Sequence, residues 1–236
     1  MSSYSVFCLS VGCESVIKLT CQFALKLFFF FCILAVCSAN LTVVFVVDGS
    51  YKMGDANFTE VGNFVGNVSR YFDVAINKTW IITAVQGNET NVYKTNEELN
   101  NITLHYPNTS RVLLGKALEM VKVRLSSNDT QRDAAIVVVL ITSHKSDDDI
   151  AVPTIDLKRM NATIFAVAIG DGVSLGQMKE IASNPDDHHL IKCNDINDLL
   201  AKSLAVVKKV CQGKDTSVFN LFSYSSVFHA RAPHCM

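Results

Sequence analysis

Residues 41–50 read LTVVFVVDGS. The first seven form a nearly continuous apolar run rich in β-branched side chains, which is typical of a strand buried on both faces. Asp48, Gly49 and Ser50 then signal a turn. The stretch therefore predicts an internal strand of a parallel sheet, with polar side chains where the strand ends.

Other strand-like runs follow along the chain. The most hydrophobic of them, AAIVVVLIT at residues 134–142, is the best candidate for the central strand, and TIFAVAI at 163–169 is a further buried strand. Residues 79–85 and 91–94 also have strand character, and the turn-like sequence between them predicts a hairpin. A hairpin of this kind would add one antiparallel strand to the edge of the sheet.

Amphipathic helical stripes alternate with these strands. Apolar residues recur at three- and four-residue steps over 58–72, over 114–125, and in a final helix that opens at Asn194 or Asp195. Ser174 and Gln177 have capping-box spacing for a short helix. The alternation predicts an α/β fold with a doubly wound, mostly parallel, Rossmann-like sheet, whose ligands are expected at the carboxyl ends of the strands.

Composition excludes some classes of function. The 236 residues suit one domain with extensions, and the net charge of -1 provides no basic face for nucleic acid. No Cys-x-x-Cys pair or Cys/His cluster has zinc-site spacing. We therefore expect no nucleic-acid partner and no zinc finger.

The N-terminal segment resembles a signal peptide. Lys18 and Lys26 precede an apolar run from Leu27 to Cys37, which is too short for a membrane-spanning helix, and small residues up to Ala39 suit cleavage. A signal anchor is the alternative. We expect a signal peptide at 1–39, a domain at 40–212 without a membrane span, and a C-terminal tail of unknown role at 213–236.

Glycosylation acceptors support a secreted, extracellular location independently. Nine Asn-x-Ser/Thr sequons occur in the presumed mature chain. So many in one domain indicate the secretory route. They lie at Asn40, Asn57, Asn67, Asn77, Asn88, Asn101, Asn108, Asn128 and Asn161.

Four blocks of sequence resemble the von Willebrand factor type A (VWA) family, in the extracellular branch that includes collagens and matrilins. They are VVFVVDGSYKMG, LLGKALEMVK, AAIVVVLIT and IFAVAIGDGVSLGQMKEIAS, in this order, and they span about Leu41 to Cys211. Members are typically found in matrix proteins, integrins and plasma proteins, where they bind other proteins. The resemblance implies a secreted adhesion or matrix-interaction module with extracellular protein partners and no catalysis.

Many members bind a divalent cation, and the resemblance locates the corresponding positions here. Asp48 and Ser50 match two ligands, but Lys52, Val112 and Ser143 replace the other three. A hard cation prefers oxygen ligands, which valine and lysine do not offer. We therefore expect no metal cofactor, and we hypothesise that the Lys52 ammonium pairs with Asp48 in the place of the ion. The alternatives are a metal-dependent adhesion domain that uses the residual ligands and a structural glycoprotein of the matrix.

Three other features have plainer interpretations. Asp147, Asp148 and Asp149 lack the ligand spacing of an EF-hand and are expected at a solvated helix start. His188 and His189 are expected in an extended segment, where adjacent side chains diverge and do not share a metal. Asp48 has no nucleophile elbow or phosphate loop around it, so we do not expect an enzyme.

The disulfide pattern stays open. The resemblance implies that Cys211, at the end of the last helix, pairs with a cysteine just before the first strand, where Cys37 stands. If cleavage follows Ala39, however, Cys37 is lost and Cys193, Cys211 and Cys235 remain, so an odd thiol could pair between chains.

Sequon positions also bear on where partners bind. Asn57 and Asn108 lie in or beside the loops of the metal face, so occupied glycans there would obstruct it. We expect partners to bind the sides of the fold.

Overall fold

The computed structural model describes residues 40–72, 74, 80–86, 90–93, 96–100, 102–127 and 134–212. The segments expected to be a signal peptide (1–39) and a tail (213–236) lie outside the described residues. The described part forms a six-stranded sheet in the order β3-β2-β1-β4-β5-β6. The strands are β1 (Leu41–Val47), β2 (Trp80–Val85), β3 (Thr90–Tyr93), β4 (Ala135–Thr142), β5 (Thr163–Ile169) and β6 (Leu190–Cys193).

The sheet confirms the predicted α/β architecture. Neighbouring strands are parallel except β2 and β3, which pair antiparallel at one edge. The AAIVVVLIT run forms β4, which lies between β1 and β5 in the interior of the sheet. Side chains of β1 and of β4 are buried on both faces of the sheet, which explains the continuous apolar sequences of these two strands.

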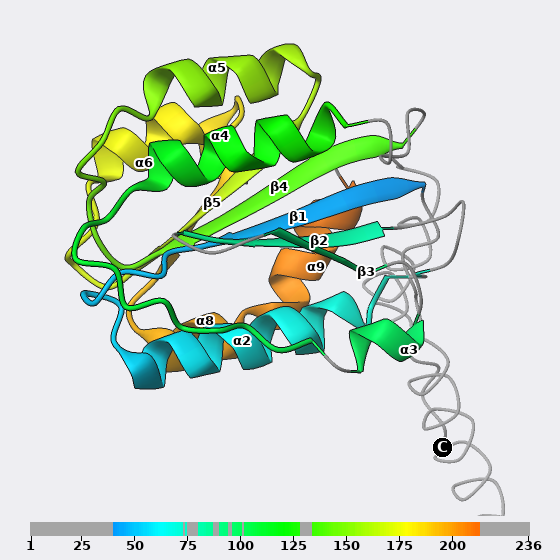
Figure 1. Ribbon diagram of the computed structural model, residues 1–236, viewed down its shortest axis with the longest axis horizontal. Coiled ribbons are helices and arrows are strands. Elements are labelled where there is room, and N and C mark those ends of the chain that lie inside the picture. The colour runs from blue at the N-terminus through cyan, green and yellow to red at the C-terminus, as the bar shows by residue number, and fades with distance from the viewer. Residues whose placement is uncertain are drawn as a thin grey trace, which may run out of the picture. The chain divides into compact units, whose positions relative to one another are not determined.

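Helices cover both faces of the sheet (Figure 1). Alternate side chains of β1 divide between them: Val43, Phe45 and Val47 pack in the core beneath α2, α8 and α9, whereas Val44 and Val46 pack beneath α4, α5 and α6. The helices are α2 (Asp55–Ser69), α3 (Asn96–Leu99), α4 (Leu114–Leu125), α5 (Ala151–Arg159), α6 (Leu175–Ile181), α7 (Asp186–His189), α8 (Ile196–Ala201) and α9 (Ser203–Gln212). None of them is both long and apolar enough to cross a bilayer.

The predicted final helix is wrong in one respect, because it is divided in two. Asp195 caps α8 by accepting a hydrogen bond from the Asp198 amide at 2.8 Å. The chain then turns at Lys202, whose ammonium donates to the Lys192 carbonyl at 2.7 Å and pairs with Asp198. These contacts hold the end of α8 beside β6, and α9 begins at the next residue.

The histidine segment also differs from its prediction. His188 and His189 lie in the helical turn α7 and not in an extended segment. The His189 ring packs against Phe165, with ring centroids 4.8 Å apart, while His188 lies beside Asp187. His189 therefore has a packing role against β5.

Candidate functional site

The loops that follow β1 and β4 meet at the carboxyl ends of the strands, as the fold class predicts. The Asp48 amide donates to the Ile141 carbonyl at 3.0 Å, which extends the β1–β4 pairing beyond the strand end. The segment before α4 joins them, because Ser50 and Thr109 form an isolated bridge. We call residues 48–54, 105–113 and 143–150 the top edge.

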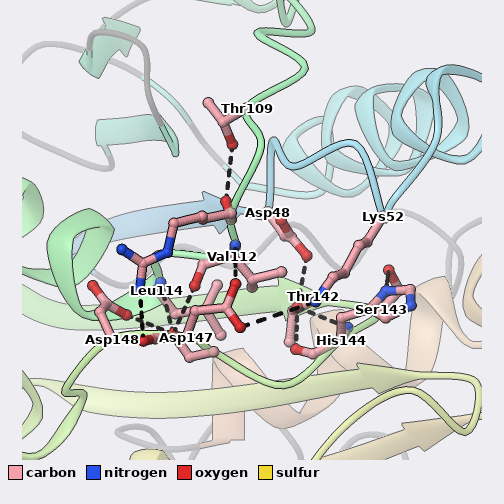
Figure 2. Close-up of polar contacts among 12 residues, drawn as sticks. Asp48, Lys52, Thr109, Val112, Leu114, Thr142, Ser143, His144, Asp147 and Asp148 are labelled. Carbon is pink, nitrogen blue, oxygen red and sulfur yellow. Dashed lines mark hydrogen bonds and ion pairs between the residues drawn. The ribbon is translucent and has the colours of Figure 1, made fainter.

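Asp48 is fully buried at the centre of the top edge (Figure 2). Its Oδ1 accepts a hydrogen bond from the Ser50 amide and its Oδ2 accepts one from the Thr142 hydroxyl, both at 2.9 Å. Burial of an acidic side chain is costly unless hydrogen bonds compensate. Here both oxygens have a donor from the protein itself.

The Ser50 side chain is buried beside Asp48. Its hydroxyl has no hydrogen-bond partner within the described structure. Its carbonyl, in contrast, accepts from the Tyr106 hydroxyl at 2.9 Å. The Ser50 hydroxyl is thus a buried oxygen atom at the top edge without a hydrogen bond to a described residue.

Lys52 does not pair with Asp48, which corrects our hypothesis. Its ammonium lies 4.0 Å from Oδ1 of Asp147, and both side chains are partly exposed. A hydrogen bond from the Val112 amide holds the pKa of Asp147 below its usual value, and the positive charges of Lys52, Arg111 and Lys145 act in the same direction. The carboxylate that Lys52 faces is therefore outside the β1 loop.

Val112 stands where the resemblance expects a threonine ligand, and its side chain is fully buried. Its backbone is bound to Asp147 in both directions: the Val112 amide donates to Oδ2 at 2.9 Å, and the Asp147 amide donates to the Val112 carbonyl at 2.7 Å. Asp147 thus connects the three loops of the top edge by ordinary protein contacts (Figure 2).

The other two acidic residues of this loop cap two different helices, which refines the prediction of a solvated helix start. Asp148 accepts hydrogen bonds from the Gly115 and Lys116 amides at 3.0 and 2.8 Å, so it caps α4 from outside that helix. Asp149 does lie at the start of α5, where it accepts from the Ala151 amide at 2.9 Å. Carboxylates also complement the positive ends of both helix dipoles.

The remaining hydroxyls near Asp48 are engaged elsewhere. The Ser143 hydroxyl lies 2.9 Å from Nδ1 of His144, and the Thr109 hydroxyl accepts from the Gln86 side chain at 2.7 Å. In the part of the chain that is described, no group of three or more His, Cys, Asp or Glu side chains is placed to hold a metal ion.

Sequence reasoning missed Thr142, Ser146 and the binding partners of Asp147. Thr142 is the last residue of β4, so its position at the same sheet edge as Asp48 was the available signal. The Ser146 hydroxyl accepts from the Leu114 amide at 3.0 Å, a contact between residues 32 positions apart. Such contacts depend on loop conformation, which the periodic spacing of apolar residues does not predict.

The described sequon asparagines share one property: they are exposed. They are Asn40, Asn57, Asn67, Asn108 and Asn161, whereas Asn77, Asn88, Asn101 and Asn128 lie outside the described residues. Asn57 follows the β1 loop in the first turn of α2, and Asn108 immediately precedes the Thr109 bridge. Asn108 therefore lies within the top edge, and Asn57 lies beside it.

Two of the disulfide candidates are described. Cys193 is buried at the end of β6 as a free thiol, and Cys211 is partly buried in α9. Burial raises the pKa of the Cys193 thiol to about 11. Cys37 and Cys235 lie outside the described residues.

Comparison with known proteins places this fold among extracellular relatives. The human collagen alpha-6(VI) chain is 26% identical over 192 residues, which is 77% of this chain and 8% of the relative. The collagen alpha-1(XII) chain of Notophthalmus viridescens is 28% identical over 188 residues (73% and 20%), and human cochlin is 24% identical over 186 residues (75% and 33%). The chain thus spans a third or less of these curated relatives.

Solved structures show the same fold. Proximal thread matrix protein 1 from the mussel byssus matches with a TM-score of 0.65 at 19% identity, over 74% of this chain and 49% of that one. Another structure of that protein, with a zinc-occupied MIDAS motif, matches with the same TM-score at 17% identity, over 75% and 47% of the two chains.

The family assignment comes from the sequence itself. The model of the von Willebrand factor type A domain matches residues 42–204, which extends from β1 into α9. The chain belongs to the von Willebrand factor type A domain family.

Proposed function

We propose that this chain is a secreted, glycosylated module of the extracellular matrix that binds other proteins without a divalent cation and without catalysis. The similarity to domains of collagen chains, vitrin and cochlin supports the matrix setting. Nine sequons and the signal-like N-terminal segment support secretion. The specific proposal concerns the top edge.

The main support for binding without a metal ion is that Asp147 connects the three loops of the top edge. In a metal-binding relative, a cation would draw oxygen ligands from separate loops together. Here Asp147 contacts the Lys52 ammonium and the Val112 backbone, while Asp48 has its oxygens satisfied by Ser50 and Thr142. The positive charge of Lys52, which stands at the sequence position of a third ligand, would also repel a divalent cation.

Partners are proposed to contact the sides of the fold. Asn57 and Asn108 are exposed and flank the top edge. Glycans on both would stand between the top edge and a protein of ordinary size. The layer of α4, α5 and α6, in contrast, has no described sequon within its helices.

The second candidate is a residual cation site. The specific observation in its favour is the buried Ser50 hydroxyl without a partner in the described structure, because such an oxygen beside Asp48 could serve a cation. The zinc-occupied motif of the byssus protein gives a structural precedent for a cation on this fold. Cation binding beside Asp48 and Ser50 would require the Lys52 side chain to move away from this site.

Calorimetric titration of the secreted protein with magnesium and manganese chloride separates the two candidates. The control is the triple variant Lys52→Ser, Val112→Thr, Ser143→Asp, which restores the family's ligand types, with its folding checked by thermal unfolding. We expect no heat of binding for the natural protein and measurable binding for the variant. Micromolar binding by the natural protein would refute metal independence and favour the residual site.

A further inference from the structure

Helix α5 exposes two apolar side chains and buries a polar one. Val152 and Ile155, one turn apart, are 59% and 48% exposed. Thr154 is only 1% exposed on the opposite face, and its hydroxyl has no partner among the described residues. An amphipathic surface helix normally keeps its apolar side chains on the buried face, as Leu157 does here. Two apolar side chains that lie together on the exposed face make the outer face of α5 a candidate contact surface.

The apolar surface extends onto the neighbouring helix. Figure 1 shows α4, α5 and α6 in one layer, with their outer faces turned away from the sheet. Val123 of α4 is 63% exposed, and its neighbour Lys122 is bound to Asp156 of α5 at 2.9 Å, which fixes the two helices side by side. We call Val152, Ile155 and Arg159 the α5 crest.

The charges at the two ends of the crest are opposite. Asp149 is exposed before the first turn of α5, and Arg159 is exposed at its last residue, about 15 Å away along the helix axis. Arg159 uses one guanidinium nitrogen to contact Asp156 at 3.3 Å, which leaves its other donors available. The crest therefore has an acidic end, an apolar centre and a basic end.

We propose that the α5 crest pairs with the α5 crest of a second copy of this chain, in an antiparallel two-fold arrangement. When Val152 of one copy faces Ile155 of the other, Arg159 of each copy lies within one residue of the level of Asp149 of the other. A two-fold interface must be self-complementary, and this surface is. Antiparallel helices also bring opposite dipole ends together.

The positions of the described sequons agree with this choice of face. Described sequons lie within α2 at Asn57 and Asn67, on the other side of the sheet, and none lies within α4, α5 or α6. Asn161 follows Arg159 by two residues, so the test uses protein whose glycans have been trimmed enzymatically to the first sugar. The inference is independent of what the module binds.

Sedimentation equilibrium is the test, from about 1 µM to about 500 µM because a contact of this size is expected to be weak. The natural protein should show a monomer–dimer equilibrium. Val152→Glu or Ile155→Glu should weaken dimerisation at least about tenfold. The matched control is Leu204→Glu, since Leu204 is a similarly exposed aliphatic residue (53%) in the opposite layer, and it should leave the equilibrium within about twofold.

The register is tested by charge exchange. Asp149→Arg alone and Arg159→Asp alone should each weaken the dimer, and the double variant should restore it. Thermal unfolding of each variant shows that the monomer is folded. A monomer throughout the concentration range, or equal effects of Ile155→Glu and Leu204→Glu, would overturn the proposal. Failure of the double variant to recover would overturn the antiparallel register.

Discussion

A single carboxylate, Asp147, connects the top edge. It comes from the loop after β4, faces the Lys52 ammonium of the loop after β1, and accepts from the Val112 amide in the segment before α4. The cation in this arrangement is a side chain of the protein, and the carboxylate that it faces titrates, so the arrangement depends on pH.

The pH dependence has a definite sign. Since the pKa of Asp147 is lower in the folded protein than in an unfolded chain, where it is about 3.9, its contribution to stability is complete above that value and is lost as the pH falls through the folded value. Asp147→Asn imitates the protonated form. We expect it to lower Tm at pH 7 and to have a smaller effect at about pH 2.5, because the contribution of the carboxylate decreases as the pH falls below the unfolded value.

The control for this prediction is Asp171→Asn, because Asp171 is exposed in the turn after β5. It should leave Tm nearly unchanged at both pH values. A Tm difference between the natural protein and Asp147→Asn that is the same at every pH would show that the carboxylate charge has no role.

Cys193 is expected to be an unreactive thiol. Burial in the core between β6 and α8 raises its pKa to about 11, so the nucleophilic thiolate is scarce at pH 8. Alkylation with iodoacetamide, followed by peptide mass spectrometry, should label Cys193 in denaturant and not in the native protein. Rapid native labelling, or recovery of Cys193 in a disulfide, would contradict the packing described here.

At the scale of elements, the contact between α4 and the loop after β4 depends on Gly115. A Cβ at this position would lie 1.9 Å from the Asp149 carbonyl oxygen, whereas a Cβ at Gly66 in α2 would meet nothing within 4 Å. Both glycines are in helices, where alanine is intrinsically favoured by about 1 kcal/mol. Replacement by alanine should therefore change the stability of the fold in opposite directions at the two positions.

We expect Gly115→Ala to destabilise the fold by about 1–3 kcal/mol and Gly66→Ala to stabilise it by about 0.5–1 kcal/mol. Thermal unfolding should show these as Tm changes of opposite sign, about 2–4 °C per kcal/mol for a domain of this size. If Gly115→Ala raised Tm as Gly66→Ala does, the close approach of the loop to α4 would be disproved.

Elements with a single strong period were predictable from sequence. The β-branched runs gave β1, β4 and β5 almost to the residue, because strands buried on both faces must be apolar throughout. The division between α8 and α9 was not predictable, since the apolar stripe continues across Lys202 and only a tertiary contact of that residue turns the chain. The pairing of Lys52 with Asp147 was missed for the same reason: sequence identifies charges but not which loops approach.

At the scale of the whole described domain, the described sequons are unevenly distributed. Asn57 and Asn67 lie on α2, Asn108 lies beside the top edge, and Asn40 and Asn161 precede β1 and β5 at the opposite edge. The described parts of the α4–α6 layer contain no sequon within a helix. If these sites are occupied, glycans cover the α2 side and both edges of the sheet, so protein contacts are left with the α4–α6 layer.

Shielding of the top edge can be measured through Lys52, whose partly exposed amine lies there. Glycans at Asn57 and Asn108 should slow its acylation by an amine-reactive ester, because the reagent must pass between them. We therefore expect Asn57→Gln with Asn108→Gln to increase the labelling rate of Lys52 several-fold in the secreted protein, as read by peptide mass spectrometry. The matched control, Asn40→Gln with Asn67→Gln, removes the same number of sequons away from the top edge and should leave the rate unchanged. Equal labelling rates in all three proteins would show that the top edge is open. The top edge would then be a better candidate for the partner-binding surface than the sides of the fold.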